Sequence, residues 1–550
     1  MSNNLKKNKE KNQFKTLIVY PNLSLMLVPS IVIALFTKIM KDQGYIVDLF
    51  DTTHYISEEN SSPQNRVKYL QARKFSDTDD LGIKIKTDLL GDFEQKVQEF
   101  KPDILIVSVV EDSFRQALKM LEQVNKYKIP HIVGGVFPTA APEVLLSFPV
   151  IRNVGIGEGE KTIVNFAEAI RVGHSLRNIP NIWGKNNDDS IFKNKLGPLV
   201  NINDYDTDFS LFDERRFFRP MGGKIFKTIP IETYRGCPYR CTYCNSPMQI
   251  QVAKENNQGK YLRRKKTDEV RDRLLEVQEI YSPEFIYFID DSFLARPEKE
   301  IYEFCDMYEE FNLPFWFNTR PENCTKEILQ RLKEVGAYRM SFGIECGNEE
   351  FRSAVLKRKV RNQETIRKFE VISQSGISYS VNLIIGFPGE TRELVMDTVE
   401  LTRLIKGYDT LTVSIFTPYH GTKLREVAVK NGWLEKNTIT THTTSESILQ
   451  MPQPYLSKDE INQLMRVIPL YCYFPRSEWK EINLAEIDDE NGNAILGHYS
   501  KIYSENFLKE NQNDRKVFIE GTGGCRSNPK DSFWLSQARL TKQEMSMLRV

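Results

Sequence analysis

The sequence "RGCPYRCTYC" at residues 235–244 places Cys237, Cys241 and Cys244 in one short segment of a 550-residue chain that has only 8 cysteines. Three thiolates can hold zinc with water as the fourth ligand. They can also hold three corners of a [4Fe–4S] cluster and leave one iron open for chemistry. Zinc motifs usually contain paired C-x2-C elements, and no second pair or matching histidine follows here. The spacing therefore favours a cluster, and zinc is the alternative.

Downstream of this segment, predicted strands and helices alternate at regular spacing, which indicates six β/α units, a partial (β/α)6 barrel. The first strand is predicted at 231–236, directly before the cysteines. Because function in barrels gathers at the carboxyl ends of the strands, the cysteine segment occupies a functional position. The later strands are predicted at 285–293, 314–320, 338–345, 379–390 and 410–422, and the helices at 267–280, 297–311, 325–334, 362–374 and 391–404.

Polar residues and glycines mark the carboxyl ends of the later strands as well. They are Asp290, Asp291, Arg320, Glu345 and the turn 386–390. Each has a structural interpretation by itself: the aspartates as helix caps, Glu345 as a buried and satisfied carboxylate, and the glycines as a turn. Their common position at strand ends favours one site at the barrel mouth.

The N-terminal part of the chain alternates apolar runs with amphipathic segments, which predicts a Rossmann-like parallel sheet covered on both faces. Ligands of such sheets bind beyond the carboxyl ends of the strands. Four glycines lie at these ends, and glycine lets a planar or phosphate-bearing ligand approach the backbone closely. Tight turns are the alternative explanation. The strands are predicted at 16–21, 46–51, 103–110, 131–135 and 153–160, and the four glycines are Gly134, Gly135, Gly157 and Gly159.

Several motifs together carry a resemblance to a known family. "CPYRCTYC", including Tyr243, matches the C-x3-C-x-aromatic-C signature of radical S-adenosylmethionine (SAM) enzymes. "GIECGNEEF" resembles their G-I-E-S-G segment, with Cys346 in place of the usual serine, and "NLIIGFPGET" and "TPYHGTKL" resemble their fifth and sixth strand ends. "GGVFPTAAPEVLLSFP" followed by "VGIGEGEKTI" resembles a cobalamin-binding domain. The chain thus resembles the cobalamin-dependent (class B) radical SAM enzymes over residues 16–170 and 229–430.

The resemblance implies three cofactors: a [4Fe–4S] cluster, S-adenosylmethionine and cobalamin. A D-x-H-x-x-G loop is absent, and His54 and His131 lie in the wrong context, so the resemblance implies a cobalt without a histidine ligand on its lower face. The implied cluster ligands are Cys237, Cys241 and Cys244; the implied SAM site contains Tyr243, Glu345, Gly386, Gly389 and Glu390; and the implied cobalamin site contains Gly134, Gly135, Gly157 and Gly159.

The implied activity is reductive cleavage of SAM to a 5'-deoxyadenosyl radical, followed by cobalamin-dependent methylation of an unactivated carbon in a small-molecule or lipid-like substrate. Flavodoxin or ferredoxin is the implied electron donor. The alternatives are an oxidative cyclase or another non-methylating enzyme, a tRNA methylthiotransferase-like enzyme and a non-catalytic cobalamin sensor. Residues 1–230 lack the extra cysteines that a methylthiotransferase needs, and a sensor needs no complete barrel.

The whole chain is therefore predicted to be of the α/β class. A formal net charge of +1 gives no overall field toward nucleic acid, so no nucleic-acid partner is expected, and a solvated loop explains the basic run 260–266. Residues 23–40, the only membrane candidate, are interrupted by Pro29 and predict a buried helix, so we expect no membrane span and a cytoplasmic location. The expected divisions are a disordered tail (1–13), a cobalamin-binding domain (14–171), a connector (172–228), a radical SAM domain (229–430) and a mostly helical C-terminal region (431–550) without a recognised motif.

Overall fold

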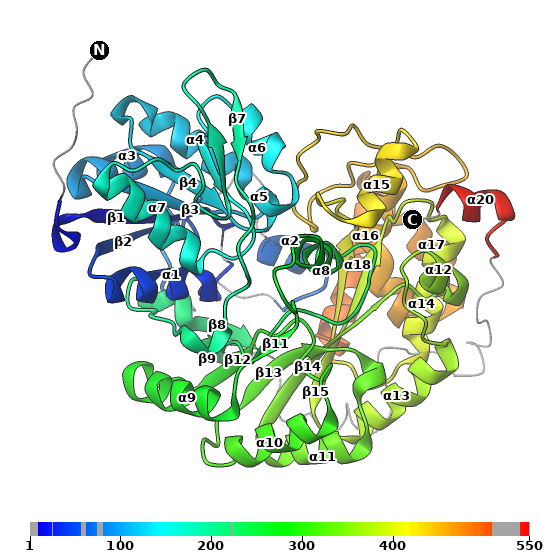
Figure 1. The fold of residues 1–550 in the computed structure, drawn as a ribbon. Coiled ribbons are helices and arrows are strands. Elements are labelled where there is room, and N and C mark those ends of the chain that lie inside the picture. The colour runs from blue at the N-terminus through cyan, green and yellow to red at the C-terminus, as the bar shows by residue number, and fades with distance from the viewer. Residues whose placement is uncertain are drawn as a thin grey trace. The chain divides into compact units, whose positions relative to one another are not determined.

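The computed structural model describes residues 9–24, 26–56, 62–73, 81–221, 224–508 and 539–548. The chain divides into two compact units (Figure 1). Within the described ranges, no helix has both the length and the apolar character that crossing a bilayer requires. The first unit comprises Met1–Ser61, Ser76–Arg219 and Met248–Lys266, and the second comprises Ser62–Phe75, Pro220–Pro247 and Thr267–Val550.

The first unit contains a seven-stranded sheet of order β2-β1-β3-β4-β5-β6-β7. Strands β1 to β5 are parallel, which confirms the predicted Rossmann-like sheet. Strands β6 and β7 continue the sheet antiparallel, and the sequence did not predict them within the connector. The strands are β1 (Lys15–Tyr20), β2 (Ile46–Asp51), β3 (Ile104–Ser108), β4 (His131–Gly134), β5 (Asn153–Gly155), β6 (Ile182–Lys185) and β7 (Ile191–Lys193).

Burial explains why these segments form a parallel sheet. Leu17, Ile18 and Val19 of β1 are at most 1% exposed, as expected for strands covered by helices on both faces. Helix α1 begins after Ser30, whose side chain accepts the Ile33 amide, and is only 12 residues long. The apolar stretch 23–40 therefore supplies a buried helix, as predicted. The helices of this unit are α1 (Ile31–Asp42), α3 (Leu89–Phe100), α4 (Phe114–Val124), α5 (Val136–Ala140), α6 (Pro142–Ser147), α7 (Glu160–Val172) and most of α8 (Ser246–Glu255).

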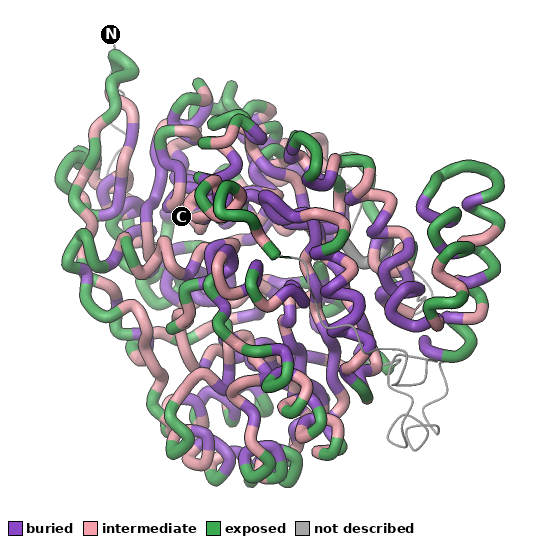
Figure 2. The backbone as a smooth tube through the Cα atoms, turned by 90° about the vertical axis from the view of Figure 1, so that its right-hand side faces the viewer, coloured by how far each residue is buried: buried purple, intermediate pink, exposed green. Residues whose placement is uncertain are grey.

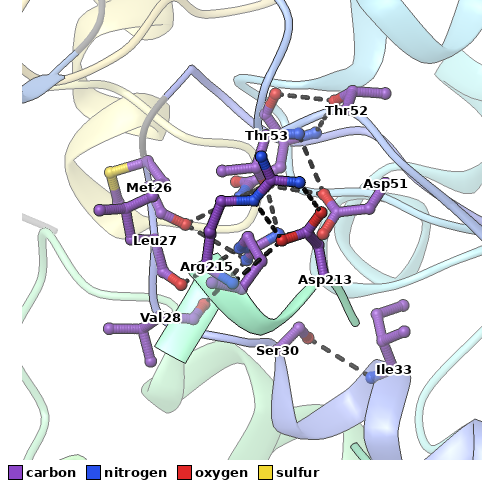
Figure 3. A network of polar contacts seen from close by, with 12 residues as sticks. Met26, Leu27, Val28, Ser30, Ile33, Asp51, Thr52, Thr53, Asp213 and Arg215 are labelled. Atoms are coloured by element: carbon purple, nitrogen blue, oxygen red, sulfur yellow. Dashed lines mark hydrogen bonds and ion pairs between the residues drawn. The ribbon is translucent and has the colours of Figure 1, made fainter. Parts of the chain in front are cut away.

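A buried arginine fixes the loop between β1 and α1. Arg216 is 1% exposed and donates to the carbonyl oxygens of Met26 (3.3 Å), Leu27 (3.1 Å) and Val28 (3.1 Å). It also contacts the Asp51 carboxylate at the end of β2, so the acceptors come from the β1–α1 loop and from a strand end (Figure 3). A guanidinium has five donors, so one side chain can satisfy several backbone carbonyls and a carboxylate together.

We expect Arg216→Met to lower the free energy of unfolding of the first unit by about 3–5 kcal/mol, because it removes the cation paired with the half-buried Asp51 carboxylate and the guanidinium donors to the Leu27 and Val28 carbonyls. The adjacent Arg215→Met is the matched control. Arg215 is exposed and pairs with Asp213, so its loss is expected to cost about 1 kcal/mol or less. Urea unfolding of the full chain measures both values, and equal losses for the two variants would contradict the role of Arg216.

The second unit is a curved half-barrel sheet of order β16-β15-β14-β13-β12-β9-β8. Six of its strands, β9 and β12 to β16, are parallel, which confirms the predicted six-strand partial barrel. The first parallel strand ends at Ile231 and not at residue 236 as predicted. The bounds are β8 (Phe218–Met221), β9 (Lys224–Ile231), β12 (Phe285–Phe288), β13 (Phe315–Thr319), β14 (Ala337–Glu345), β15 (Ser378–Ile385) and β16 (Thr410–Ile415), with two short strands, β10 (Tyr234–Arg235) and β11 (Arg263–Arg264), elsewhere in the chain.

Helices follow the strands of the half barrel, within one or a few residues of their predicted positions (Figure 1). The described part of the C-terminal region is mostly helical, as predicted, whereas residues 521–525 lie outside the described residues. Exposed residues are concentrated on helix surfaces and turns (Figure 2). The helices are α9 (Thr267–Tyr281), α10 (Glu298–Tyr308), α11 (Lys326–Glu334), α12 (Glu349–Ala354), α13 (Asn362–Gln374), α14 (Arg392–Leu404), α15 (Lys423–Lys430), α16 (Lys458–Tyr473), α17 (Trp479–Leu484), α18 (Glu490–Asn506) and α20 (Lys542–Met547).

A short N-terminal segment also belongs to the second unit. Helix α2 (Ser62–Lys68) is followed by Gln71, whose Oε1 accepts the backbone N–H of Val413 on the edge strand β16 at 2.9 Å. Asn65 donates to the Thr444 carbonyl at 3.0 Å. These contacts satisfy backbone groups beside an edge strand, where a sheet otherwise has unpaired donors and acceptors.

Candidate functional site

Asp290 positions the start of the cysteine loop. Its buried carboxylate accepts the backbone N–H groups of Thr233 (2.8 Å) and Tyr234 (3.0 Å) and pairs with Arg296 at 2.5 Å. The amides of Thr233 and Tyr234 are therefore engaged away from the β9 ladder, which explains why β9 ends at Ile231. Asp290 is thus neither a helix cap nor an open site residue. It is a structural residue that fixes the backbone directly before the cysteine loop.

The three cysteines lie on this loop, close enough to influence one another electrostatically. Burial raises the pKa of Cys237 to about 11, with smaller contributions from Asp291, Cys244 and Cys241, and burial also raises the pKa of Cys244. In the described part of the chain, no three His, Cys, Asp or Glu side chains stand close enough to ligate one metal ion. Cluster thiolates bind separate irons and stand farther apart than the ligands of a single ion. Three neighbouring thiols on one loop are a donor set that fits an iron–sulfur cluster.

Asp291 has a different environment from Asp290. Its side chain is exposed to solvent, yet surrounding protein raises the pKa of its carboxyl by desolvation, and Ser246 donates to it at 3.3 Å. The Asp291 carboxyl lies close enough to Cys237 and Cys244 to act on both thiols electrostatically.

Residues at the end of β13 hold the cysteine loop from a second side. Arg320 donates from Nη2 to the Cys241 sulfur at 2.6 Å, and its guanidinium carbon lies 3.5 Å from the centre of the Tyr239 ring. The Tyr239 hydroxyl donates to Asn323 Oδ1 at 2.8 Å. Arg320 also pairs with Glu322 at 3.1 Å. The position of Arg320 at a strand end was noted in the sequence, but its contact with a cysteine was not predicted.

Glu345 and Tyr243, two predicted SAM-site residues, lie together. The Tyr243 hydroxyl donates to Glu345 Oε1 at 3.3 Å, and Arg358 Nη1 donates to the same oxygen at 3.1 Å. Glu345 has a φ of 67°, beside a β-bulge between Gly343 and Glu345. Positive φ in a non-glycine residue is strained and is typical of functional sites. Burial raises the pKa of Glu345, and the Arg358 guanidinium opposes that rise.

Arg358 is the residue of this group that the sequence analysis missed. It is buried, and it also donates to the Gly343 carbonyl at 2.7 Å. A Cβ at Gly343 would lie 2.0 Å from Glu345 Oε1, so the glycine makes room for the carboxylate. Arg358 lies in "LKRKV", between other basic residues, where no periodicity distinguishes it. Only its position in three dimensions identifies it.

The turn at the end of β15 is held by contacts within the chain itself. Glu390 is fully buried, and its Oε2 accepts the N–H groups of Gly386 (2.6 Å) and Phe387 (3.1 Å). A Cβ at Gly386 would lie 2.9 Å from Ile461, and one at Gly389 would lie 2.6 Å from Leu548. The chain's own side chains therefore cover both glycines. A role of Gly386, Gly389 and Glu390 in binding SAM stays a prediction.

In the first unit, the structure separates the four predicted glycines into two kinds. A Cβ at Gly135 would lie 2.2 Å from the Val109 carbonyl oxygen, and one at Gly159 would lie 2.4 Å from the Phe36 ring, so these two serve internal packing. Among the described residues, a Cβ at Gly134 would meet no atom closer than 4.0 Å, and one at Gly157 would meet none within 4 Å, although the φ of 77° at Gly157 also favours glycine. These two leave backbone open at the carboxyl ends of β4 and β5, which fits a ligand that approaches the sheet edge closely.

Side chains hold these two strand ends in place. Thr139 accepts the Gly157 N–H at 2.9 Å and donates to the Gly135 carbonyl at 2.8 Å. Arg263 makes two hydrogen bonds with Glu158, at 3.0 and 2.5 Å. Arg263 belongs to the basic run 260–266, so the prediction of a merely solvated loop is wrong for this residue. His131 begins β4, at the end opposite Gly134, which agrees with its exclusion as a ligand.

Comparison with family models identifies two domains in the chain. The model of the radical SAM superfamily matches residues 231–402, which contain the cysteine loop, Arg320, Glu345 and the turn 386–390. The model of the B12 binding domain matches residues 67–167, which contain the four glycines.

Relatives of this chain are named for different activities. An uncharacterized methyltransferase of Pyrococcus horikoshii is 25% identical over 68% of this chain and 80% of its own length. The anaerobic magnesium-protoporphyrin IX monomethyl ester cyclase of Rubrivivax gelatinosus is 24% identical over 56% of this chain and 55% of its own length. The cytidylyl-2-hydroxyethylphosphonate methyltransferase of Streptomyces wedmorensis is 20% identical over 66% of this chain and 73% of its own length.

Two solved structures share the fold. The radical SAM methyltransferase TsrM from Kitasatospora setae, with cobalamin and a [4Fe–4S] cluster bound, matches with a TM-score of 0.56 and 16% identity over 76% of this chain and 78% of its own. The cobalamin-dependent SAM radical enzyme OxsB, with aqua-cobalamin bound, matches with a TM-score of 0.60 and 15% identity. The match covers 90% of this chain and 72% of the OxsB chain. At these identities the likeness concerns the fold.

Proposed function

We propose that this chain is a SAM-cleaving enzyme that methylates an unactivated carbon of a small-molecule or lipid-like substrate. The chain joins a B12-binding domain to a radical SAM domain, as the cobalamin-dependent radical SAM enzymes do. The observation that carries the proposal is the convergence of three cysteines, Asp291 and the Arg358-bound Glu345 at the carboxyl ends of half-barrel strands. The relatives named as methyltransferases support the choice of methylation.

Each residue of the site has a distinct proposed task. Cys237, Cys241 and Cys244 would hold a [4Fe–4S] cluster, which with bound SAM would supply a 5'-deoxyadenosyl radical, and cobalamin would supply the methyl carrier. Glu345 and Tyr243 bind the SAM molecule, and Arg358 keeps the Glu345 carboxylate oriented. The open backbone at Gly134 and Gly157 accepts cobalamin.

The remaining parts of the proposal concern organisation. We propose a cobalamin-binding domain at 14–171 and a radical SAM domain at 229–430, separated by the connector 172–228 and followed by the region 431–550. All 7 described cysteines are free, which suits a reducing compartment, and we therefore propose the cytoplasm. Flavodoxin or ferredoxin is the proposed electron donor.

The test is anaerobic purification, reconstitution with iron, sulfide and hydroxocobalamin, and incubation with SAM carrying a deuterated methyl group and a strong reductant. We expect iron–sulfur and corrin absorbance, and formation of both 5'-deoxyadenosine and S-adenosylhomocysteine. With an extract of the source cells as the substrate pool, mass spectrometry should find a metabolite that has gained a deuterated methyl group. A protein that binds zinc, or that leaves SAM intact, would contradict the proposal.

An oxidative cyclase is the second candidate, because one relative is named as a cyclase. Such an enzyme would form 5'-deoxyadenosine in the same assay, and its product would lose hydrogen and gain no label. The ratio of the two nucleoside products therefore distinguishes the candidates before the substrate is known.

A further inference from the structure

The Arg320 guanidinium is held against the cysteine loop by contacts of three different kinds. It donates to the Cys241 sulfur at 2.6 Å, stacks on the Tyr239 ring at 3.5 Å and pairs with Glu322 at 3.1 Å. We propose that Arg320 is a positioning residue that acts through Cys241 and stabilises the reduced state of the cluster. This inference rests on the proposed function, because it concerns the cluster that the cysteines are proposed to hold.

The physical argument concerns charge. Reduction adds one electron, taken from a low-potential one-electron donor, and the added negative charge spreads partly over the thiolate sulfurs. Hydrogen bonds to those sulfurs are among the features that set the potential of an iron–sulfur cluster. A guanidinium stays positively charged at every working pH. The Arg320 side chain is 12% exposed, so water screens this charge only weakly.

The neighbours of Arg320 explain why arginine is needed. The Tyr239 ring takes one face of the planar guanidinium, and the Tyr239 hydroxyl is itself fixed by Asn323 at 2.8 Å. The Glu322 carboxylate pairs with Nη1 of Arg320, and Nη2 of Arg320 is directed at the Cys241 sulfur. Lysine keeps the charge, but it has no planar fork that can stack, pair and donate at once.

The experiment measures the midpoint potential of the reconstituted cluster by a redox titration followed by electron paramagnetic resonance, with iron content and circular dichroism as checks. For Arg320→Gln we expect the equilibrium constant for cluster reduction to fall about tenfold, which is about 59 mV for a one-electron couple. Arg320→Lys and Tyr239→Leu are expected to give smaller shifts in the same direction. Arg331→Gln is the matched control, since Arg331 pairs with Asp306 and Glu309 outside the site.

Each outcome decides the proposal. Lowered potentials in the Arg320 and Tyr239 variants, with the wild-type value in Arg331→Gln, support it. An unchanged potential in Arg320→Gln, an equal shift in Arg331→Gln, or loss of the cluster from all three Arg320 and Tyr239 variants overturns it in favour of a purely structural role. If the wild-type protein itself holds no reducible cluster, it is the proposed function that fails.

Discussion

Replacement of Cys241 by alanine is expected to lower the rate of 5'-deoxyadenosine formation by about a thousandfold or more, a loss of at least about 4 kcal/mol of transition-state stabilisation. The reason is that the loop then offers two thiolates, which do not suffice to hold the cluster with a single open iron. Arg320 loses its sulfur partner at the same time. Liquid chromatography of a reaction with SAM and a strong reductant measures the product, and iron analysis measures the cluster.

Cys305→Ala is the control for this prediction. Cys305 is also a buried free thiol of the second unit, but it lies on α10, outside the site. We expect normal iron content and normal 5'-deoxyadenosine formation in this variant. The assignment of Cys241 would be refuted if Cys241→Ala kept both the cluster and the activity while folding normally.

The fold could be predicted from the sequence wherever local patterns specify it. The apolar runs of the parallel strands and the amphipathic helices between them gave both sheets, because a strand buried on two faces reads as a continuous apolar run. Strands β6 and β7 were missed, since they are short and partly exposed and therefore show no such run. The end of β9 was misplaced because it depends on Asp290, 57 residues further along the chain.

The candidate site also contains some residues that a local pattern predicts and others that no local pattern predicts. The cysteines lie within one short motif, so their spacing predicts a shared ligand role, with a cluster favoured and zinc as the alternative. Arg320 contacts Cys241 across 79 residues, and Arg358 contacts Tyr243 across 115, and no local pattern encodes such a contact. For the glycines of the first unit, the sequence predicted the positions but not the individual roles. Only the structure separates Gly134 and Gly157, which leave open backbone, from Gly135 and Gly159, which serve packing.

Glu390 is expected to make the stability of the second unit strongly dependent on pH. Burial raises its pKa to about 8, and its Oε1 has no hydrogen-bond partner among the residues that the structure describes. The folded state therefore holds a proton that the unfolded chain, with a pKa of 4.5, releases at lower pH. Stability from this group is complete below pH 4.5, falls as the pH rises toward about 8, and is lost above that value. Since one pKa unit corresponds to about 1.4 kcal/mol, the loss has a ceiling of about 5 kcal/mol.

Urea unfolding of the wild type and of Glu390→Gln between pH 5 and pH 9 tests this expectation. Glutamine keeps the shape and both backbone hydrogen bonds without a titrating proton, so the variant is expected to gain stability relative to the wild type as the pH rises. Glu393→Gln removes an exposed carboxylate from the first turn of α14, the helix that follows the turn 386–390, and controls for the change in net charge. A difference between wild type and Glu390→Gln that stayed constant with pH would show that Glu390 is ionised in the folded protein. Its carboxylate would then need a cationic partner, and bound SAM, a sulfonium with an ammonium group, is the partner that its predicted site would supply.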